Sequence, residues 1–306
     1  MSTAKPLLVS FAFDEQGAEV LDLAADVASR IGAPLGVVHS LGWRPFESTE
    51  HRAARAEQAE EEISKLLGPA REAGVELLKP VIRRGQPADA AIEAGNELGA
   101  QMLVTGGGGT ETVRRWLLGS VAESIVRSSN LPVLVARRPL QGDTSPVVCP
   151  LDLSPHAREG LRTAAAMARV LGRPLVTLTV VPAELDTGYV VRNDAIPVDE
   201  ADARDKIAVF VQSVDLEGLD VEHRVVAHAD AATAIAAASE EAELLVMATR
   251  SFSEITPTGM GAFTERVLRA AASSVLVQRV FDVEPETDEQ AMRRLGQLRA
   301  SAVSHL

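Results

Sequence analysis

The sequence predicts an α/β protein with two doubly wound, Rossmann-like domains of the flavodoxin type. Each domain is expected to hold a five-stranded parallel sheet, and the two are expected to form an internal pseudo-dimer. Three observations support this prediction. Aliphatic runs of strand length alternate with longer segments of helical periodicity. The whole alternation occurs twice along the chain. The length of 306 residues is typical of about two domains.

The repeat is visible in matching segments of the two halves. Gly32-Ala33-Pro34-Leu35 corresponds to Gly172-Arg173-Pro174-Leu175, 140 residues later. LPVLVARR, from Leu131, corresponds to SSVLVQRV, from Ser273, 142 residues later. A period of this length indicates a duplicated domain, because solenoid repeats are much shorter. We place the first domain at residues 1–139, the second at 140–281 and a C-terminal tail at 282–306.

In the first half, the pattern predicts five strands with helices between them. The first strand is Leu7–Ser10, and Asp14 is the expected N-cap of a helix over Glu15–Ile31 that Gly32 ends. The remaining elements are a strand at Leu35–His39, a helix at Glu50–Leu67, a strand at Val75–Ile82, a helix at Pro87–Leu98, a strand at Met102–Thr105, a helix at Gly119–Ser128 and a strand at Pro132–Ala136.

The second half repeats this order. Its strands are expected at Val147–Leu151, Leu175–Val180, Val221–Val226, Leu244–Met247 and Val275–Gln278, and its helices at Leu161–Leu171, Glu200–Val214, Ala231–Ser239 and Thr264–Ala271. Aliphatic strands between helices are typical of parallel sheets covered on both faces. The fifth strand of each half would be an edge that needs covering, so we expect these two strands to pair with each other.

The tail after Asp282 has no counterpart in the first half. Its apolar residues fall at helical spacing: Ala291, Met292, Leu295, Leu298 and Ala302. The tail is therefore expected to form an amphipathic helix. It docks either on the body of the protein or on a partner chain.

Composition excludes several classes of function. The net charge of −13 disfavours general binding to nucleic acid or to an anionic membrane. The one cysteine, Cys149, lies in an apolar run and is expected to be buried. No apolar stretch approaches the roughly 20 residues of a membrane span, and the N-terminus has no extended apolar signal region. A cytoplasmic protein without a membrane span is expected by default.

A glycine run follows the predicted strand Met102–Thr105. Glycines let backbone N–H groups face an anion without a β-carbon in the way, and a helix start attracts phosphate. A Ser hydroxyl and the N–H of Val121 would add donors there. Alternatively, the glycines only permit a tight turn. The pattern Gly-x2-Gly-x9-Gly-Ser consists of Gly106, Gly109, Gly119 and Ser120.

This pattern resembles the nucleotide-binding signature of the universal stress protein family. The surrounding segment MLVTGGGG…WLLGSVAESIVRSSNLPVLVARRP resembles that family's C-terminal half, and the resemblance covers both halves, from about Leu7 to Val280. It implies a tandem stress-response regulatory protein that binds ATP or a related adenine nucleotide through the first domain. Mg²⁺ is expected only with the nucleotide. The adenine and ribose would lie near the ends of the first and second strands.

Each half departs from the family pattern at a different place. The family carries a D-x-S segment after the first strand, where the aspartate contacts the nucleoside. Asp152-Leu153-Ser154 fits this pattern, but the first half has Ala12-Phe13-Asp14 with Phe11 before it. In the second half, the loop has Ala248, Ser251 and Ala262, and only Gly261 of the four-residue signature remains. We therefore expect nucleotide in the first domain only. Asp152 is either a residual ribose contact or a strand-end carboxylate beside a helix cap at Ser154.

Two alternatives stand beside the nucleotide-binding regulator. One is a scaffold without nucleotide, or a module for an apolar ligand or a protein partner, with degenerate sites. The other is a slow ATP hydrolase, which ranks last. The sequence shows no paired nucleophile and base and no metal-type histidine spacing, so we expect no enzyme and no metal site. His39 is expected to be a satisfied histidine near the core. Expected partners are an adenine nucleotide and an unidentified protein, and a homodimer is an open alternative.

Overall fold

The computed structural model describes residues 4–14, 16–108, 118–140, 144–183, 200–250 and 260–280. The first half contributes β1 (Leu7–Phe11), α1 (Gly17–Ile31), β2 (Leu35–Ser40), α2 (Thr49–Leu66), α3 (Gly68–Glu72), β3 (Val81–Arg83), α4 (Pro87–Glu97), β4 (Met102–Gly106), α5 (Ser120–Ser128) and β5 (Val133–Ala136). The predicted tail helix, from Ala291 to Ala302, lies outside the described residues.

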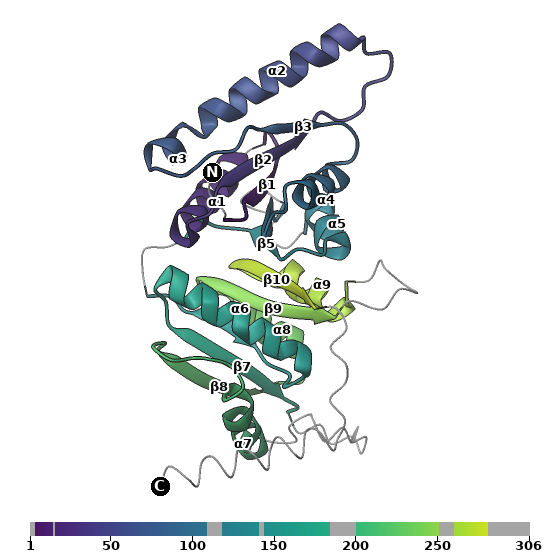
Figure 1. The fold of residues 1–306 in the computed structure, drawn as a ribbon. Helices are drawn as coiled ribbons and strands as arrows, with labels where there is room; N and C mark the ends of the chain where they lie inside the picture. The colour runs from purple at the N-terminus through teal and green to yellow at the C-terminus, as the bar shows by residue number, and fades with distance from the viewer. Residues whose placement is uncertain are drawn as a thin grey trace.

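The second half contributes an equivalent set of elements. They are β6 (Val147–Pro150), α6 (Pro155–Leu171), β7 (Leu175–Val181), α7 (Glu200–Val211), β8 (Val221–Ala227), α8 (Ala231–Ala238), β9 (Leu244–Arg250), α9 (Ala262–Ala270) and β10 (Ser274–Val280). All ten strands form one sheet in the order β3-β2-β1-β4-β5-β10-β9-β6-β7-β8 (Figure 1). Each half therefore has the same parallel order, with its strands arranged 3-2-1-4-5, which confirms the predicted doubly wound, Rossmann-like fold class. The predicted flavodoxin type is wrong in detail, because its strand order is 2-1-3-4-5.

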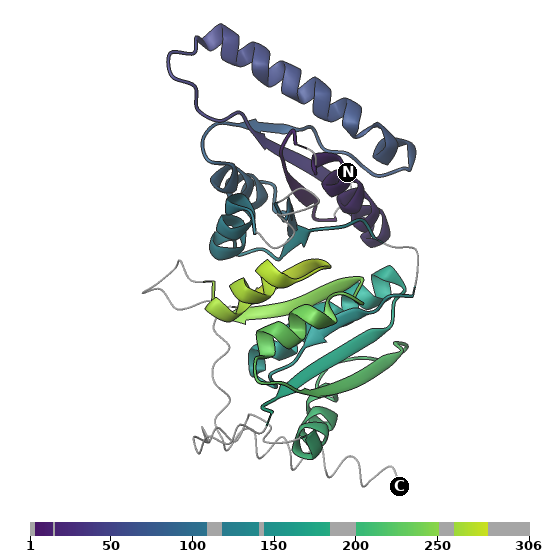
Figure 2. The ribbon, with the colours of Figure 1, turned by 180° about the vertical axis from the view of Figure 1, so that it is seen from behind.

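Helices cover both faces of the sheet. Successive β1 residues point to opposite faces, so Leu7, Val9 and Phe11 join one apolar cluster and Leu8 joins the other. Helices α1 and α6 cover the first face, and α4, α5, α8 and α9 cover the second. In the second half, α6 lies over the face seen in Figure 1, and α8 and α9 lie over the face seen from behind in Figure 2. The strand ends are thus held rigidly between two buried layers.

The two halves join through their fifth strands. β5 and β10 pair antiparallel, with Val135 opposite Val275 and Val133 opposite Val277. The pairing covers both predicted edges and confirms the internal pseudo-dimer. The remaining edges of the sheet are β3 and β8.

Two equivalent arginines cross this junction in opposite directions. Arg279 Nη1 donates to the carbonyl oxygens of Arg127 and Ser129, at 2.8 and 3.3 Å, where α5 ends. Arg137 donates in turn to the carbonyl oxygen of Leu268 near the end of α9. Burial lowers the pKa of both guanidinium groups. Each half therefore supplies a cation to the last turn of a helix in the other half, where the helix dipole favours it.

Two predicted elements of the first half are wrong in part. The strand expected over Val75–Ile82 is reduced to β3, with one isolated bridge between Leu77 and Leu35. Pro80 explains the interruption, since it has no N–H for the ladder. Helix α3 was not expected from the sequence. It begins directly after α2, with Pro69 in its first turn, where proline is tolerated.

The start of α1 also differs from the prediction. The helix begins at Gly17, its N-cap is Gln16, and Asp14 does not cap it. Asp14 instead forms a turn before the helix: its Oδ1 accepts from the Gln16 N–H at 3.1 Å and its carbonyl oxygen accepts from the Gly17 N–H at 3.2 Å. The predicted helix end is confirmed, because Gly32 adopts φ of +64° as a left-handed cap.

Candidate functional site

A cavity of about 260 Å³ lies at the carboxyl ends of β1 and β4 in the first domain. This is the edge where open parallel sheets bind ligands. Its lining includes Ser10 and Thr105 at the strand ends. Four of the predicted site residues come together here: Gly106, Gly119, Ser120 and Val121. Gly109 lies outside the described residues.

Backbone hydrogen bonds fix the glycine loop to its surroundings. The Gly107 N–H donates to the Ala136 carbonyl oxygen, and the Gly119 N–H donates to the Gly107 carbonyl oxygen, both at 2.8 Å. Gly108 adopts φ of +78°, which only glycine reaches readily. A β-carbon on Gly119 would lie 3.3 Å from Gly108 Cα. The loop and the start of α5 are therefore in contact, and glycine is needed on both sides of it.

Helix α5 points an open N-terminus at the cavity. Its N-cap is Gly119, which offers no side chain to accept from the first-turn N–H groups. Ser120, Val121 and Ala122 of this first turn all line the cavity. Free N–H groups and the positive end of the helix dipole make such a position favourable for an anion.

Helix packing is a second physical reason for a glycine at position 106. A β-carbon there would lie 3.3 Å from Val20 Cγ2 on α1. In the second domain, the glycine of the equivalent contact is on the helix and the larger residue is on the strand. A β-carbon on Gly160 of α6 would lie 3.2 Å from the β-carbon of Ala248. The alanine in the second loop is thus matched by a glycine on its helix. Close approach of helix and strand is preserved in both domains.

Asp14 is a candidate functional residue that the sequence comparison missed. Asp14 lines the first cavity, although it stands two residues beyond the position where the family carries its aspartate. Asp14 Oδ1 accepts a hydrogen bond from the Gln16 N–H at 3.1 Å. The signal that could have identified it is an acidic residue in the turn between the first strand and α1.

An aromatic group lies next to the same site. The rings of Phe11 and Phe13 meet edge to face at 4.9 Å, and Phe13 meets His39 in the same way at 4.8 Å. His39 Nδ1 lies 2.9 Å from the Phe11 carbonyl oxygen. The expectation that His39 is a satisfied histidine near the core is confirmed. Phe11 forms part of the cavity wall and leaves the cavity open.

The second domain has its own cavity of about 340 Å³ at the equivalent strand ends. Asp152 and Gly261, the two predicted residues of this half, both line it. Asp152 Oδ1 accepts from the Ser154 N–H at 3.0 Å, and Ser154 Oγ caps α6 by accepting from the Ala157 N–H at 3.2 Å. Asp152 therefore supports a helix start, as one of the two interpretations predicted. Each cavity is lined by residues of one half only.

The described residues show no group of three or more histidine, cysteine or acidic side chains that could hold a metal ion. Cys149 is fully buried, as expected. Its burial, and secondarily the charge of Asp152, raise the pKa of its thiol. None of the described helices has both the length and the apolar character to cross a membrane.

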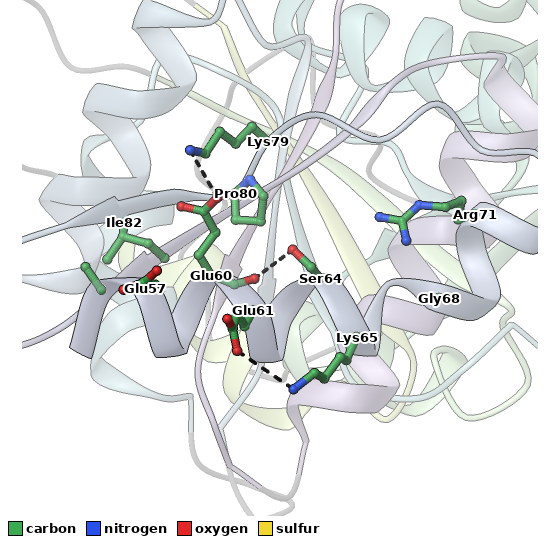
Figure 3. Close-up of a pocket in the computed structure, with 11 residues that line it drawn as sticks. Glu57, Glu60, Glu61, Ser64, Lys65, Gly68, Arg71, Lys79, Pro80 and Ile82 are labelled. Atoms are coloured by element: carbon green, nitrogen blue, oxygen red, sulfur yellow. Dashed lines mark hydrogen bonds and ion pairs between the residues drawn. The ribbon is translucent and has the colours of Figure 1, made fainter. Parts of the chain in front are cut away.

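A larger hollow of about 900 Å³ lies away from the strand ends, between α2 and the segment that leads into β3 (Figure 3). Lys79 Nζ faces Glu60 there at 3.0 Å, and Lys65 lies 4.0 Å from Glu61. These exposed charges pair with one another across the hollow and along the helix. Because the hollow lies at the amino-terminal side of β3, we do not include it in the candidate site.

Comparisons with known proteins agree with this geometry. The model of a family described as the universal stress protein family matches residues 3–137 and again residues 144–279. A curated protein of Staphylococcus haemolyticus, described as a universal stress protein, is 30% identical over 143 residues, which cover 45% of this chain and 87% of that protein. Another, of Staphylococcus aureus strain USA300, is 29% identical over 160 residues, which cover 50% of this chain and 96% of that protein.

A solved structure resembles the chain over both halves. The crystal structure of a universal stress protein from Archaeoglobus fulgidus superposes with a TM-score of 0.71 at 21% identity, covering 89% of this chain and 98% of that one. At this identity, the superposition shows a shared fold.

Proposed function

This chain belongs to the universal stress protein family, with two domains of the family in tandem, and from this premise we propose that its first domain binds an adenine nucleotide in a stress-response regulatory role. The proposal rests on the first cavity. Three loop or cap glycines, Gly106, Gly108 and Gly119, surround the open first turn of α5 there. Backbone N–H groups at a helix start are a ready seat for phosphate.

In this proposal, the phosphate groups lie at the start of α5 and the nucleoside lies toward β1. Ser120 is exposed at the first helical position, so its hydroxyl can donate to a phosphate oxygen. Asp14 can accept hydrogen bonds from the ribose hydroxyls. It would replace the family's aspartate, because Ala12 occupies that position in the first half. Mg²⁺ would enter with the nucleotide, because the described residues build no metal site of their own.

We propose a binding role without turnover. Among the described residues that line the first cavity, Asp14 is the one acidic side chain, and there is no histidine or cysteine. A carboxylate beside the nucleoside is in no position to activate water at the γ-phosphate. Incubation with ATP is therefore expected to release no phosphate above the buffer blank.

The experiment is to denature freshly purified protein, identify the released small molecules by mass spectrometry, and titrate stripped protein with ATP, ADP and AMP by calorimetry. One nucleotide for each chain is expected, because only the first domain has the glycine loop. No released nucleotide together with a flat titration would overturn the proposal and favour a scaffold.

A matched pair of variants locates the site. Ser120→Glu places a negative charge in the first turn of α5, which suits the helix dipole but repels phosphate, so more than about tenfold of the affinity should be lost without loss of fold. Ala262→Glu makes the same change at the equivalent first position of α9 and should leave the affinity unchanged. Wild-type affinity in Ser120→Glu would show that the phosphate lies elsewhere.

A further inference from the structure

We propose that the cavity of the second domain binds a small phosphate-free molecule with an apolar body and a hydrogen-bond-donating end, either a hydroxyl or an ammonium group. This site is separate from the nucleotide site proposed for the first domain. It differs from the first cavity in the side chains at three strand ends and at the start of the last helix.

Strand register makes the two cavities comparable residue by residue. Leu7 pairs with Leu35 and Met102 in the first half, as Val147 pairs with Leu175 and Leu244 in the second. At the strand ends, three hydroxyl side chains line the first cavity and three apolar ones replace them in the second. Ser10, Ser40 and Thr105 correspond to Pro150, Val180 and Met247.

The first two positions of the last helix also become more apolar. Ser120 of α5 corresponds to Ala262 of α9, and Val121 corresponds to Phe263, while the buried Thr264 replaces Ala122 at the third position. Phe263 lines the second cavity while 43% of its surface remains exposed. Leu178 and Ile235 add further aliphatic wall. An apolar wall of this kind favours an apolar ligand body through the area that it removes from water.

Phosphate finds fewer side-chain donors in this cavity. Neither cavity has a lysine or arginine among its described lining residues, and each has one aspartate, so the difference lies at the helix start, where Ala262 replaces the Ser120 hydroxyl and Phe263 replaces Val121. A phosphate moved from water to this more apolar wall therefore gains fewer compensating hydrogen bonds. The 340 Å³ volume lies near the lower end of the range for small-molecule sites, so the ligand is small.

Asp152 sets the preference of the site for the polar group of the ligand. Its Oδ1 already accepts from the Ser154 N–H, and an ionised carboxylate has further acceptor positions but no donor. Deeper in the cavity, the buried hydroxyls of Thr249 and Thr264 lie 3.3 Å apart and bond each other. The preferred partner of this carboxylate is therefore a hydroxyl or an ammonium group at the mouth.

The test uses three probes with the same aromatic body and different ends: 2-phenylethylamine, 2-phenylethanol and phenylacetate. Binding is followed in the full chain by NMR of ¹³C-labelled methionine methyl groups. The Met247 methyl lines the second cavity, and Met102 in β4 of the first domain serves as the internal reference. The amine and the alcohol should shift Met247 and leave Met102 in place. Phenylacetate should bind about twofold to fivefold more weakly than the amine, since Asp152 is exposed and screened.

Variants distinguish the contribution of the apolar wall to binding from that of the Asp152 carboxylate. Val180→Ser should weaken the amine and the alcohol by about fivefold, since it removes apolar contact area, whereas Ser40→Val at the equivalent first-domain position should change neither. Asp152→Asn should abolish the difference between amine and carboxylate.

Three results would overturn the proposal: no Met247 shift with any probe at millimolar concentration, equal binding of phenylacetate and amine to the wild-type chain, or a Met247 shift with AMP. Failure here leaves the first-domain proposal untouched, because the nucleotide assay reports on Ser120 and the probe assay on Met247.

Discussion

Gly106 lies directly against Val20 of α1, so that a β-carbon on Gly106 would be only 3.3 Å from Val20 Cγ2. The second domain makes the same contact with Gly160 on the helix and Ala248 on the strand. One glycine of each pair is therefore required for a helix to approach the strand end, whatever ligand is bound. The glycine signature in the first half therefore has a packing role at Gly106, besides the phosphate binding proposed for it.

The first prediction tests this contact by a double-mutant cycle. Gly106→Ala should destabilise the protein by about 1–2 kcal/mol through overpacking against Val20. Val20→Ala should cost about 2 kcal/mol through lost burial. The double variant should cost less than the sum by about 0.5–1.5 kcal/mol, because the smaller side chain makes room for the new β-carbon. Urea unfolding monitored by circular dichroism measures all three free energies.

Gly68→Ala is the matched control, because nothing lies within 4 Å of a β-carbon there. It should change the unfolding free energy by no more than about 0.5 kcal/mol. Additive effects of Gly106→Ala and Val20→Ala would show that the two residues do not compete for space.

The contrast between local and tertiary signals explains which features could be predicted from sequence. Strand–helix alternation and the left-handed glycine cap at Gly32 depend on local chain preferences, and the structure confirms them. The need for glycine at position 17, by contrast, comes from the Ala12 carbonyl oxygen and the ring of Phe11, which a β-carbon there would meet at 2.3 and 2.8 Å. Such contacts are set by the packing of a strand end against a helix, and periodicity carries no information about them.

The candidate site divides in the same way. Gly106, Gly119, Ser120 and Val121 share one cavity because their spacing already places them on one loop and one helix. Asp14 lines the first cavity as the equivalent Ser154 lines the second, so the position is shared and only the side chain differs. A position-by-position comparison with the family pattern misses Asp14, because its carboxylate comes from a position two residues after Ala12.

The second prediction assigns Asp14 to the nucleoside part of the ligand. Adenosine, which has no phosphate, is the probe. Asp14→Asn keeps an oxygen that can accept from the Gln16 N–H but removes the ionised carboxylate, so adenosine affinity should fall by about threefold to tenfold. Calorimetric titration measures the change.

Asp152→Asn is the control in the second domain and should leave adenosine affinity unchanged. If Asp14→Asn instead tightens ATP while adenosine affinity stays constant, Asp14 only repels phosphate and makes no contact with the nucleoside.

The third prediction concerns the junction between the halves. Arg279 is 7% exposed and donates to two carbonyl oxygens at the end of α5. Arg279→Ala should destabilise the protein by about 2–3 kcal/mol, because those carbonyls lose a charged donor in a buried place. Arg279→Lys should recover only part of this, since an ammonium group is a single point donor. Chemical denaturation measures both variants.

Arg269→Ala provides the comparison across the same junction. Arg269 lies 2.9 Å from Glu123 of the other half, but its side chain is 37% exposed. Its removal should cost less than about 1 kcal/mol, because solvent screens an exposed ion pair. A cost for Arg269→Ala equal to that of Arg279→Ala would contradict the role given to burial.

The fourth prediction is that Cys149 does not react in the native protein. Its side chain is 0% exposed, and its raised thiol pKa leaves almost no thiolate at pH 8. A chromogenic disulfide reagent should release no colour from folded protein over an hour, and should titrate the single thiol after addition of urea. Rapid reaction without urea would show that β6 opens far more readily than its burial indicates.

The fifth prediction concerns pH and His223 in the edge strand β8. His223 Nδ1 lies 2.7 Å from Oγ1 of Thr177, a fully buried residue of β7. Burial lowers the pKa of this imidazole in the folded protein. The unfolded chain keeps the ordinary value near about 6.5, so it takes up a proton first as the pH falls. Acidification from about pH 7.5 to about pH 5.5 should therefore destabilise the folded protein through this residue.

His223→Gln isolates that contribution, because glutamine bonds Thr177 without titrating. The urea midpoint of the wild-type chain should fall more than that of His223→Gln over the same pH range, while other titrating groups act equally on both. NMR titration of the His223 ring gives an independent value, expected below about 6.5. Parallel pH profiles of the two proteins would show that His223 contributes no pH-dependent stability. A ring pKa above that value would mean that the fold stabilises the charged imidazole and that this residue stabilises the protein in acid.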